Sequence, residues 1–99
     1  MKFKYQLYFT QAFLRKVKKL YKKTPSIKKQ IDRIFYLMQS DPFAPQLKTH
    51  KVLDRFGKPA YSSRVNGDLR VTWTIQDDVP KILNIFSIGG HSGSKKIYK

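Results

Sequence analysis

The fold of this chain is decided by the stretch Tyr61-Ser62-Ser63-Arg64-Val65-Asn66-Gly67-Asp68-Leu69-Arg70-Val71-Thr72-Trp73. Polar turn residues separate two runs of alternating residues, which is the pattern of a β-hairpin. A two-residue Asn-Gly turn would pair Arg64 with Leu69 and put an arginine on the face of a core leucine. A loop widened to residues 66–68 pairs Val65 with Leu69 instead, and the apolar residues of both strands then share one face. We therefore predict the wider loop.

The opposite face of this hairpin is polar. It carries Ser62 beside Thr72, and it places Arg64 directly across from Arg70. Directly opposed like charges destabilise a pair of strands. Each arginine could have its own Asp partner, but the chain has only six acids, all Asp, so we favour two guanidiniums without such partners. Their planar donor forks fit phosphate oxygens, so we expect an anionic ligand on this face.

Helical patterns precede the hairpin. Residues 5–9 alternate as a short strand, Thr10 is a suitable N-cap, and two amphipathic helices follow, separated by a break at Thr24-Pro25. The second helix is expected from about Ser26 to about Ser40. The apolar stripes of the two helices are Phe13, Val17, Leu20 and Tyr21 in the first, and Ile27, Ile31, Ile34, Phe35 and Met38 in the second.

Extended patterns dominate the rest of the chain. Residues 47–53 are expected to be partly extended, and a glycine-rich, then basic tail begins at Gly89. We predict one α+β domain over residues 1–99, in the order β-α-α-β-β-β, with the helical hairpin packed on one face of a mostly antiparallel sheet. Trp73 is expected in the core, and Tyr8, Tyr36 and Tyr61 are expected to pack rather than to stack on bases. The strands after the helices are predicted at Ala60–Val65, Leu69–Gln76 and Lys81–Ile88.

Composition limits the function. Lys and Arg number 21 against six acids, a net charge of +15, and nucleic acid or an acidic protein would relieve the resulting self-repulsion. The absence of cysteine excludes a thiol nucleophile and a Cys-based zinc site. The absence of Glu and the scattered Asp residues favour phosphodiester chemistry without a metal or other cofactor. No apolar run approaches the roughly 18 residues of a membrane span, and the N-terminus does not resemble a signal peptide, so we expect a cytoplasmic protein.

Several stretches together resemble the RelE/ParE superfamily of toxin–antitoxin toxins, and more closely its RelE-like mRNA interferases. The resemblance implies a toxin that enters the ribosomal A site, contacts mRNA and ribosomal RNA, and is inhibited by an acidic antitoxin. It also implies metal-independent cleavage, in which the mRNA 2′-OH attacks the adjacent phosphate and leaves a cyclic phosphate and a 5′-OH. With the helical hairpin, the stretches that carry it are Leu47–Leu53, Tyr61–Val71 and Ile88–Tyr98.

The resemblance also implies roles for individual residues. Arg64 and Arg70 match basic strand positions that would stabilise charge on the phosphorane. His91 would take the 2′-OH proton or protonate the 5′-oxygen, and Tyr98 would stack on a base or assist proton transfer. The remaining basic residues that would contact RNA are Lys48, His50 and Lys51 before the hairpin and Lys95 and Lys96 in the tail, with the segment before the hairpin also offering a second acid or base.

One departure affects the general base. Some relatives carry a glutamate just before this basic segment, where Pro45-Gln46 stands here. The base would then be His91, His50 or a deprotonated Lys.

Two other functions remain open. One is a ParE-type toxin that binds DNA gyrase and cuts nothing itself, and the other is an RNA-binding module without catalysis. The presence together of His91, Tyr98 and the Arg64–Arg70 pair favours RNA cleavage.

Overall fold

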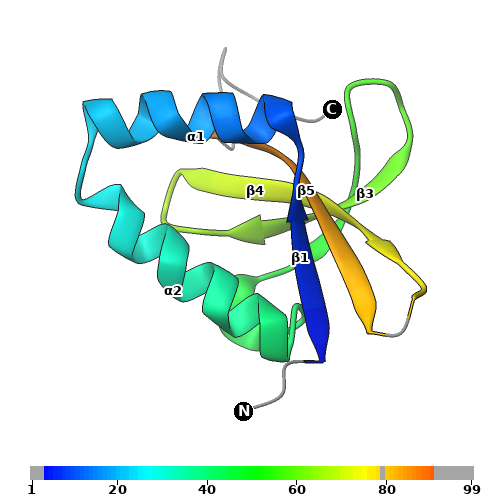
Figure 1. Ribbon diagram of the computed structural model, residues 1–99. Coiled ribbons are helices and arrows are strands. Elements are labelled where there is room, and N and C mark those ends of the chain that lie inside the picture. Colours follow the sequence, from blue (N-terminus) through cyan, green and yellow to red (C-terminus); the bar gives the residue numbers. More distant parts are fainter. Residues whose placement is uncertain (1–3, 79, 91–99) are drawn as a thin grey trace.

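The computed structural model describes residues 4–78 and 80–90. Within these residues, two α-helices and one short 3-10 helix lie among five strands, and both α-helices cover the same face of the sheet (Figure 1). The elements are β1 Tyr5–Phe9, α1 Gln11–Lys23, α2 Ile27–Ser40, the 3-10 helix η1 Pro45–Leu47, β2 His50–Leu53, β3 Pro59–Arg64, β4 Leu69–Gln76 and β5 Lys81–Gly90. The predicted α+β class and the helical hairpin on one face are confirmed.

The strands of this described region form one sheet in the order β1-β5-β4-β3-β2. β1 runs parallel to β5, and the three other neighbouring pairs are antiparallel. The β1–β5 pair is parallel because the chain crosses over through the helices and the other strands before it returns. α1 packs against β5 and α2 against β1, so the helices cover one face. We call the other face the helix-free face.

The β3–β4 hairpin has the predicted register. Tyr61 pairs with Trp73 and Arg64 pairs with Arg70, and the Val65 backbone N–H donates to the Leu69 carbonyl at 2.9 Å. The wider loop is closed by Asn66, whose Oδ1 accepts from the backbone N–H of Asp68 at 3.0 Å and of Leu69 at 2.9 Å.

The first helix begins where its cap was predicted. Thr10 is extended, and its Oγ1 accepts from the Phe13 backbone N–H at 3.2 Å, which satisfies one of the donors that a helix N-terminus leaves free. The Thr24 N–H closes the last turn on the Leu20 carbonyl at 2.9 Å. The second helix follows Ser26, which makes no side-chain capping bond.

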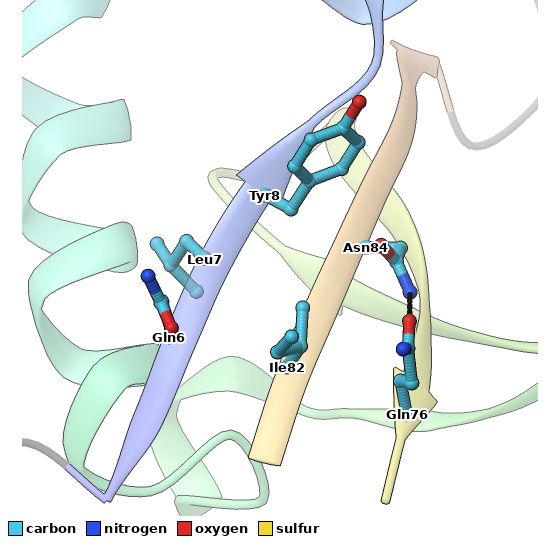
Figure 2. A pocket seen from close by; sticks show the side chains of 6 residues that line it. All are labelled: Gln6, Leu7, Tyr8, Gln76, Ile82 and Asn84. Carbon is cyan, nitrogen blue, oxygen red and sulfur yellow. Dashed lines mark hydrogen bonds between the residues drawn. The ribbon is translucent and has the colours of Figure 1, made fainter. Parts of the chain in front are cut away.

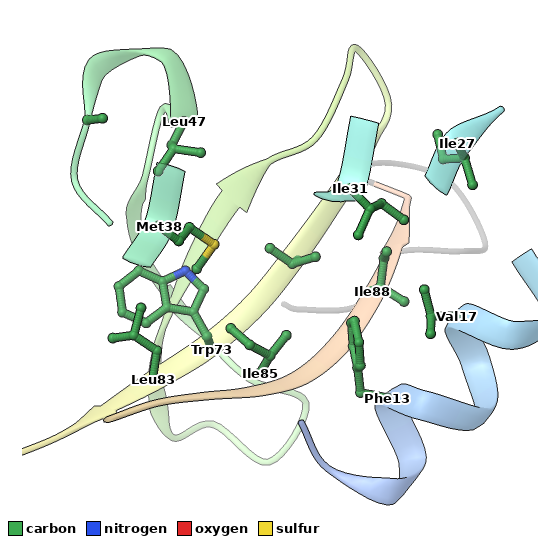
Figure 3. Packing of buried hydrophobic residues seen from close by; sticks show 12 residues of the cluster. Phe13, Val17, Ile27, Ile31, Met38, Leu47, Trp73, Leu83, Ile85 and Ile88 are labelled. Atoms are coloured by element: carbon green, nitrogen blue, oxygen red, sulfur yellow. The ribbon is translucent and has the colours of Figure 1, made fainter. Parts of the chain in front are cut away.

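The core lies between the helices and the sheet (Figure 3). Trp73 is completely buried, as predicted, and the Tyr61 ring stacks on it with 4.9 Å between centroids. The buried apolar residues include Phe13 and Val17 of α1, Ile27, Ile31 and Met38 of α2, Leu47 of η1, Val71 and Trp73 of β4, and Leu83, Ile85 and Ile88 of β5.

Tyr8 and Tyr36, which were expected to pack, are largely exposed. Their side chains are 59% and 55% exposed. In β1, Leu7 and Phe9 pack against the core, and strand alternation therefore turns Tyr8 to the helix-free face.

The sheet differs from the predicted one in two respects. The segment 47–53 is partly extended, as expected: it holds the strand β2, His50–Leu53. The sheet of the described residues therefore has one strand more than the predicted order. β5 continues to Gly90, because Gly89 pairs with Arg70 and Gly90 with Leu69. In the part of the chain that the structure describes, neither α-helix has the length and apolarity that crossing a membrane requires.

Candidate nucleic-acid interface

Arg64 and Arg70 lie directly opposite each other on the helix-free face. Val65 and Leu69 form a hydrogen-bonded pair of the antiparallel ladder. The adjacent pair, Arg64 and Arg70, is therefore a non-hydrogen-bonded pair, in which the two Cα atoms lie about 4.5 Å apart. Both side chains are half-buried. Arg64 Nε donates to the Asn66 carbonyl at 3.1 Å, which turns the arginine toward the loop and fixes its orientation. The hairpin thus concentrates two positive charges at one point of the sheet.

Most of the acids have partners away from this pair. Asp32 pairs with Lys28 at 2.9 Å and Asp77 with Lys81 at 3.5 Å. Asp41 and Asp54 accept backbone N–H groups in their own turns, and Asp78 accepts from Gln76 Nε2. Among the described residues, five of the six Asp side chains are therefore engaged elsewhere. As expected from the sequence, they are helix-surface, cap and turn residues.

His50 shares the helix-free face with the arginines. It pairs with Ser62, and Arg64 is two residues further along β3, so the two are diagonal neighbours about 7–8 Å apart. His50 Nδ1 lies 3.1 Å from the Lys48 carbonyl. A carbonyl can only accept, so Nδ1 carries the hydrogen, and Nε2 of the neutral ring is the nitrogen that can accept a proton.

A chain of polar groups holds the segment that carries Lys48 and His50. Thr49 Oγ1 donates to the Pro42 carbonyl at 2.7 Å, and it lies 2.7 Å from Ser63 Oγ. Ser63 Oγ also accepts from Trp73 Nε1 at 2.8 Å. Since the Thr49 hydrogen is used on Pro42, Ser63 must donate to Thr49, and all bonds in the chain run in one direction. This chain joins the buried tryptophan to the start of β2, where Lys48 adopts a left-handed conformation with φ 47°.

Two hydroxyls in the row of paired residues next to the arginine pair are buried. Ser62 and Thr72 pair with each other and are fully buried. Within the described residues, neither Ser62 Oγ nor Thr72 Oγ1 has a hydrogen-bond partner. Such groups are rare, and each costs about 1–3 kcal/mol. Strand alternation predicts the polar face for this pair, but it does not predict that the pair is buried there.

The other predicted site residues lie elsewhere. Lys51 pairs with Tyr61, so it shares the core-facing side of the sheet and not the face of Arg64 and His50. His91 and Tyr98, with the tail lysines Lys95 and Lys96, fall outside the described residues. Residues 4–78 and 80–90 contain no group of three or more His or acidic side chains that could hold a metal ion.

Solved structures with the same arrangement of elements include three bacterial proteins. YafQ from Escherichia coli strain BL21(DE3) is 18% identical, with a TM-score of 0.67 over 86% of this chain and 91% of that one. A YoeB/ParE toxin from Agrobacterium tumefaciens is 16% identical, with a TM-score of 0.68 over 88% and 99%. A copper-bound mutant toxin from Helicobacter pylori is 23% identical, with a TM-score of 0.62 over 87% and 93%.

The chain has the RelE/ParE-like toxin fold. The fold expected from the resemblance is therefore confirmed. No family model matches the sequence, and no curated protein matches it. The RelE/ParE-like fold by itself does not select between RNA cleavage and gyrase binding, because one fold can carry both activities.

Proposed function

We propose that this chain is the toxin of a type II toxin–antitoxin system and that it cleaves mRNA in the ribosomal A site. The observation that carries the proposal is the opposed Arg64–Arg70 pair on the helix-free face, beside His50. Its support is threefold: a net charge of +15, a fold shared with proteins named as toxins, and an arginine pair that an anion would stabilise.

The arginines act on the phosphate that is cut. The 2′-OH of the preceding nucleotide loses its proton and attacks the phosphorus, and the bond to the 5′-oxygen breaks. The products are a 2′,3′-cyclic phosphate and a 5′-OH, and the leaving oxygen takes up one proton. Arg64 and Arg70 hold the non-bridging oxygens and stabilise the added charge of the phosphorane.

His50 is a candidate for the proton acceptor. Its Nδ1 is held by the Lys48 carbonyl, and in the neutral ring Nε2 is then the nitrogen whose lone pair would accept the 2′-OH proton. His91 is the other candidate, with Tyr98 stacking on a base or assisting proton transfer. Lys48, Lys51, Lys95 and Lys96 contact mRNA or ribosomal RNA in this proposal, with Lys51 reaching RNA from the other side of the sheet.

The proposed system includes an inhibitor and a compartment. An acidic, partly disordered segment of an antitoxin would be attracted by the +15 charge and would order on binding. Translation takes place in the cytoplasm, and we assign the toxin to it. A short acidic reading frame next to that of this chain is the expected genetic context.

A translation extract with a reporter mRNA tests the activity. The wild-type chain should cut the message in frame, while Arg64→Gln and Arg70→Gln should each lower the cleavage rate by about 100-fold or more, as for loss of one transition-state donor. Arg55→Gln is the charge-matched control, because Arg55 lies at the β2–β3 turn over the Phe56 ring and should cut normally. Comparing His50→Ala with His91→Ala identifies the base.

Other outcomes would reject the proposal. Intact mRNA together with gyrase-linked DNA breaks would assign the chain to the gyrase-binding class. Intact RNA and DNA, with salt-sensitive RNA binding, would leave a binding module without catalysis.

A further inference from the structure

A hollow lies on the helix-free face, away from the arginine pair. It spans the strands β1, β5 and β4 and has a volume of about 360 Å³. Figure 2 shows the six residues that line it: Gln6, Leu7, Tyr8, Gln76, Ile82 and Asn84. Tyr8 presents a side chain that is 59% exposed.

Strand alternation connects this hollow to the arginines. Leu7, Leu83 and Ile75 face the core, so Tyr8, Asn84 and Gln76 face the other way. The register agrees, because Tyr8 pairs with Asn84 across β1 and β5. On β4, the residues on the helix-free face run from Arg70 to Gln76. This distance is about 20 Å at the usual rise per strand residue, which is the length of a few nucleotides.

The lining has the chemistry of a base site and not of a phosphate site. None of the six side chains is charged, in a protein whose net charge is +15. An exposed aromatic ring provides a surface on which any base can stack. The side-chain amides provide donors and acceptors for the edge of a base, while phosphate would be held at the arginines.

Hydrogen bonds orient two of these amides. Gln76 Nε2 donates to Asp78 Oδ2 at 2.8 Å, and a carboxylate can only accept. Gln76 Oε1 then accepts from Asn84 Nδ2 at 3.4 Å (Figure 2). In the Asn84 amide, the carbonyl oxygen is left to face a ligand. At this point the hollow therefore suits a base edge that donates, such as the amino group of adenine or cytosine.

We infer that this hollow is a nucleobase subsite. It would bind a base a few nucleotides along the RNA strand whose phosphate lies at Arg64 and Arg70, with the ring stacked on Tyr8 and an amino group bonded to Asn84. The inference rests on the proposed function, since it takes RNA to be the ligand of the helix-free face. Such a subsite would make the protein prefer certain bases at a position a few nucleotides away from the bond that is cut.

The test is the binding of RNA that cannot be cut, made with 2′-O-methyl groups, to the full chain. Tyr8→Ala should weaken binding of an oligonucleotide of about eight residues by about 5- to 100-fold, and Tyr8→Phe should not. Binding of a dinucleotide should be unchanged in both. Tyr36→Ala is the matched control, because Tyr36 is 55% exposed on α2 and should bind as wild type does.

Base preference is the second readout. The wild-type chain should prefer oligocytidylate to oligouridylate, because both are pyrimidines and cytosine has the amino group that uracil lacks. Asn84→Ala should abolish the difference while Tyr8 still supports stacking. Unfolding midpoints close to that of the wild type would show that these variants fold.

The outcomes separate this inference from the function it rests on. If Arg70→Gln loses RNA affinity and Tyr8→Ala does not, the subsite is rejected and the RNA function stands. If neither variant changes RNA binding, both are rejected. The inference would be overturned if Tyr8→Ala weakened the binding of an acidic peptide and the chain did not bind the longer RNA. The hollow would then be a binding site for a protein.

Discussion

Arg64 and Arg70 occupy opposed positions at the loop end of the β3–β4 hairpin. Like charges that lie directly opposite each other weaken the pairing of two strands. The register cannot relieve it, because a one-residue shift would move Val71 and Trp73 out of the core. We infer that two guanidinium groups kept opposite each other at a fixed register serve to bind an anion.

A double-mutant cycle measures this repulsion. Arg64→Gln, Arg70→Gln and the double variant should give a coupling free energy of about 0.2–1 kcal/mol with the sign of a destabilising pair. Added phosphate should reduce that coupling by neutralising the pair. Urea unfolding of the four proteins provides the numbers, and a stabilising or zero coupling would show that the arginines do not repel each other.

The sequence was sufficient for the arginine pair but not for every residue of the site. Arg64 and Arg70 could be placed because the apolar alternation of both strands admits one register. The same alternation puts Lys51 and His50, which are adjacent in the chain, on opposite faces of the sheet. Alternation predicts which residues share a face of a strand, but it does not predict which face is covered. It therefore could not predict that Ser62 and Thr72 are buried and that Tyr8 is exposed.

At the scale of the elements, the turns define the sheet. In the β2–β3 turn, Gly57 has φ 79°, and Asp54 accepts the backbone N–H groups of Phe56 and Lys58 at 2.8 and 2.9 Å. In the β3–β4 loop, Gly67 does not have a positive φ, and the nearest group to an added Cβ would be Arg64 Nη2 at 4.0 Å. The Asn-Gly pair therefore does not act here as a two-residue turn. The bonds of Asn66 close the loop.

Substitutions distinguish the two turns. Gly57→Ala should destabilise the protein by about 1–2 kcal/mol, because an L-residue is strained in the left-handed region. Gly67→Ala should be neutral or stabilising by up to about 1 kcal/mol, and Asn66→Ala should cost about 1–3 kcal/mol because it removes the bonds to Asp68 and Leu69. Equal losses of stability at the two glycines, measured by urea unfolding, would contradict the turn assignment.

The helical hairpin contains a group that responds to alkaline pH. Partial burial raises the pKa of the Tyr21 phenol above its ordinary value of 10.0, and the nearby Asp32 carboxylate adds to the rise, while Lys28 opposes it. The folded state then holds this proton more tightly than the unfolded state does. The contribution to stability is complete below pH 10 and is lost as the pH rises through the folded-state pKa.

Tyr21→Phe isolates this contribution. Relative to the variant, the wild-type chain should lose free energy of unfolding between about pH 8 and about pH 11, the range that spans the tyrosine titration. Urea unfolding of both proteins at the two pH values measures the change. A constant difference between them would mean that the phenol titrates alike in the folded and unfolded states.

At the scale of the whole molecule, cations lie on both sides of the sheet. The helix-free face has the arginine pair, and the outer surface of α1 is lined with exposed basic side chains. These are Arg15, Lys16, Lys18, Lys19, Lys22 and Lys23. We infer that the basic residues of α1 attract RNA over long range and that the arginine pair on the sheet binds a single phosphate.

Salt dependence tests this division. Replacing Lys16, Lys19 and Lys23 together by Gln should slow RNA association. The slope of log K against log salt concentration should become less steep by up to about 0.7 for each phosphate that the variant no longer neutralises. The position of the cut in a reporter mRNA should not change. If the triple variant moved the cut or abolished it, the lysines of α1 would belong to the cleavage site itself.

The central claim is that this toxin fold cuts mRNA through the 2′-hydroxyl next to a phosphate held by Arg64 and Arg70. The most direct test uses ribosomes programmed with an mRNA that carries one 2′-deoxy nucleotide on the 5′ side of the bond that is cut. We predict that the bond next to the 2′-deoxy nucleotide stays intact. The wild-type protein should cut the unmodified bond to a 2′,3′-cyclic phosphate and a 5′-OH, and Arg70→Gln should cut that bond far more slowly. Cleavage of the deoxy bond at the wild-type rate would contradict it.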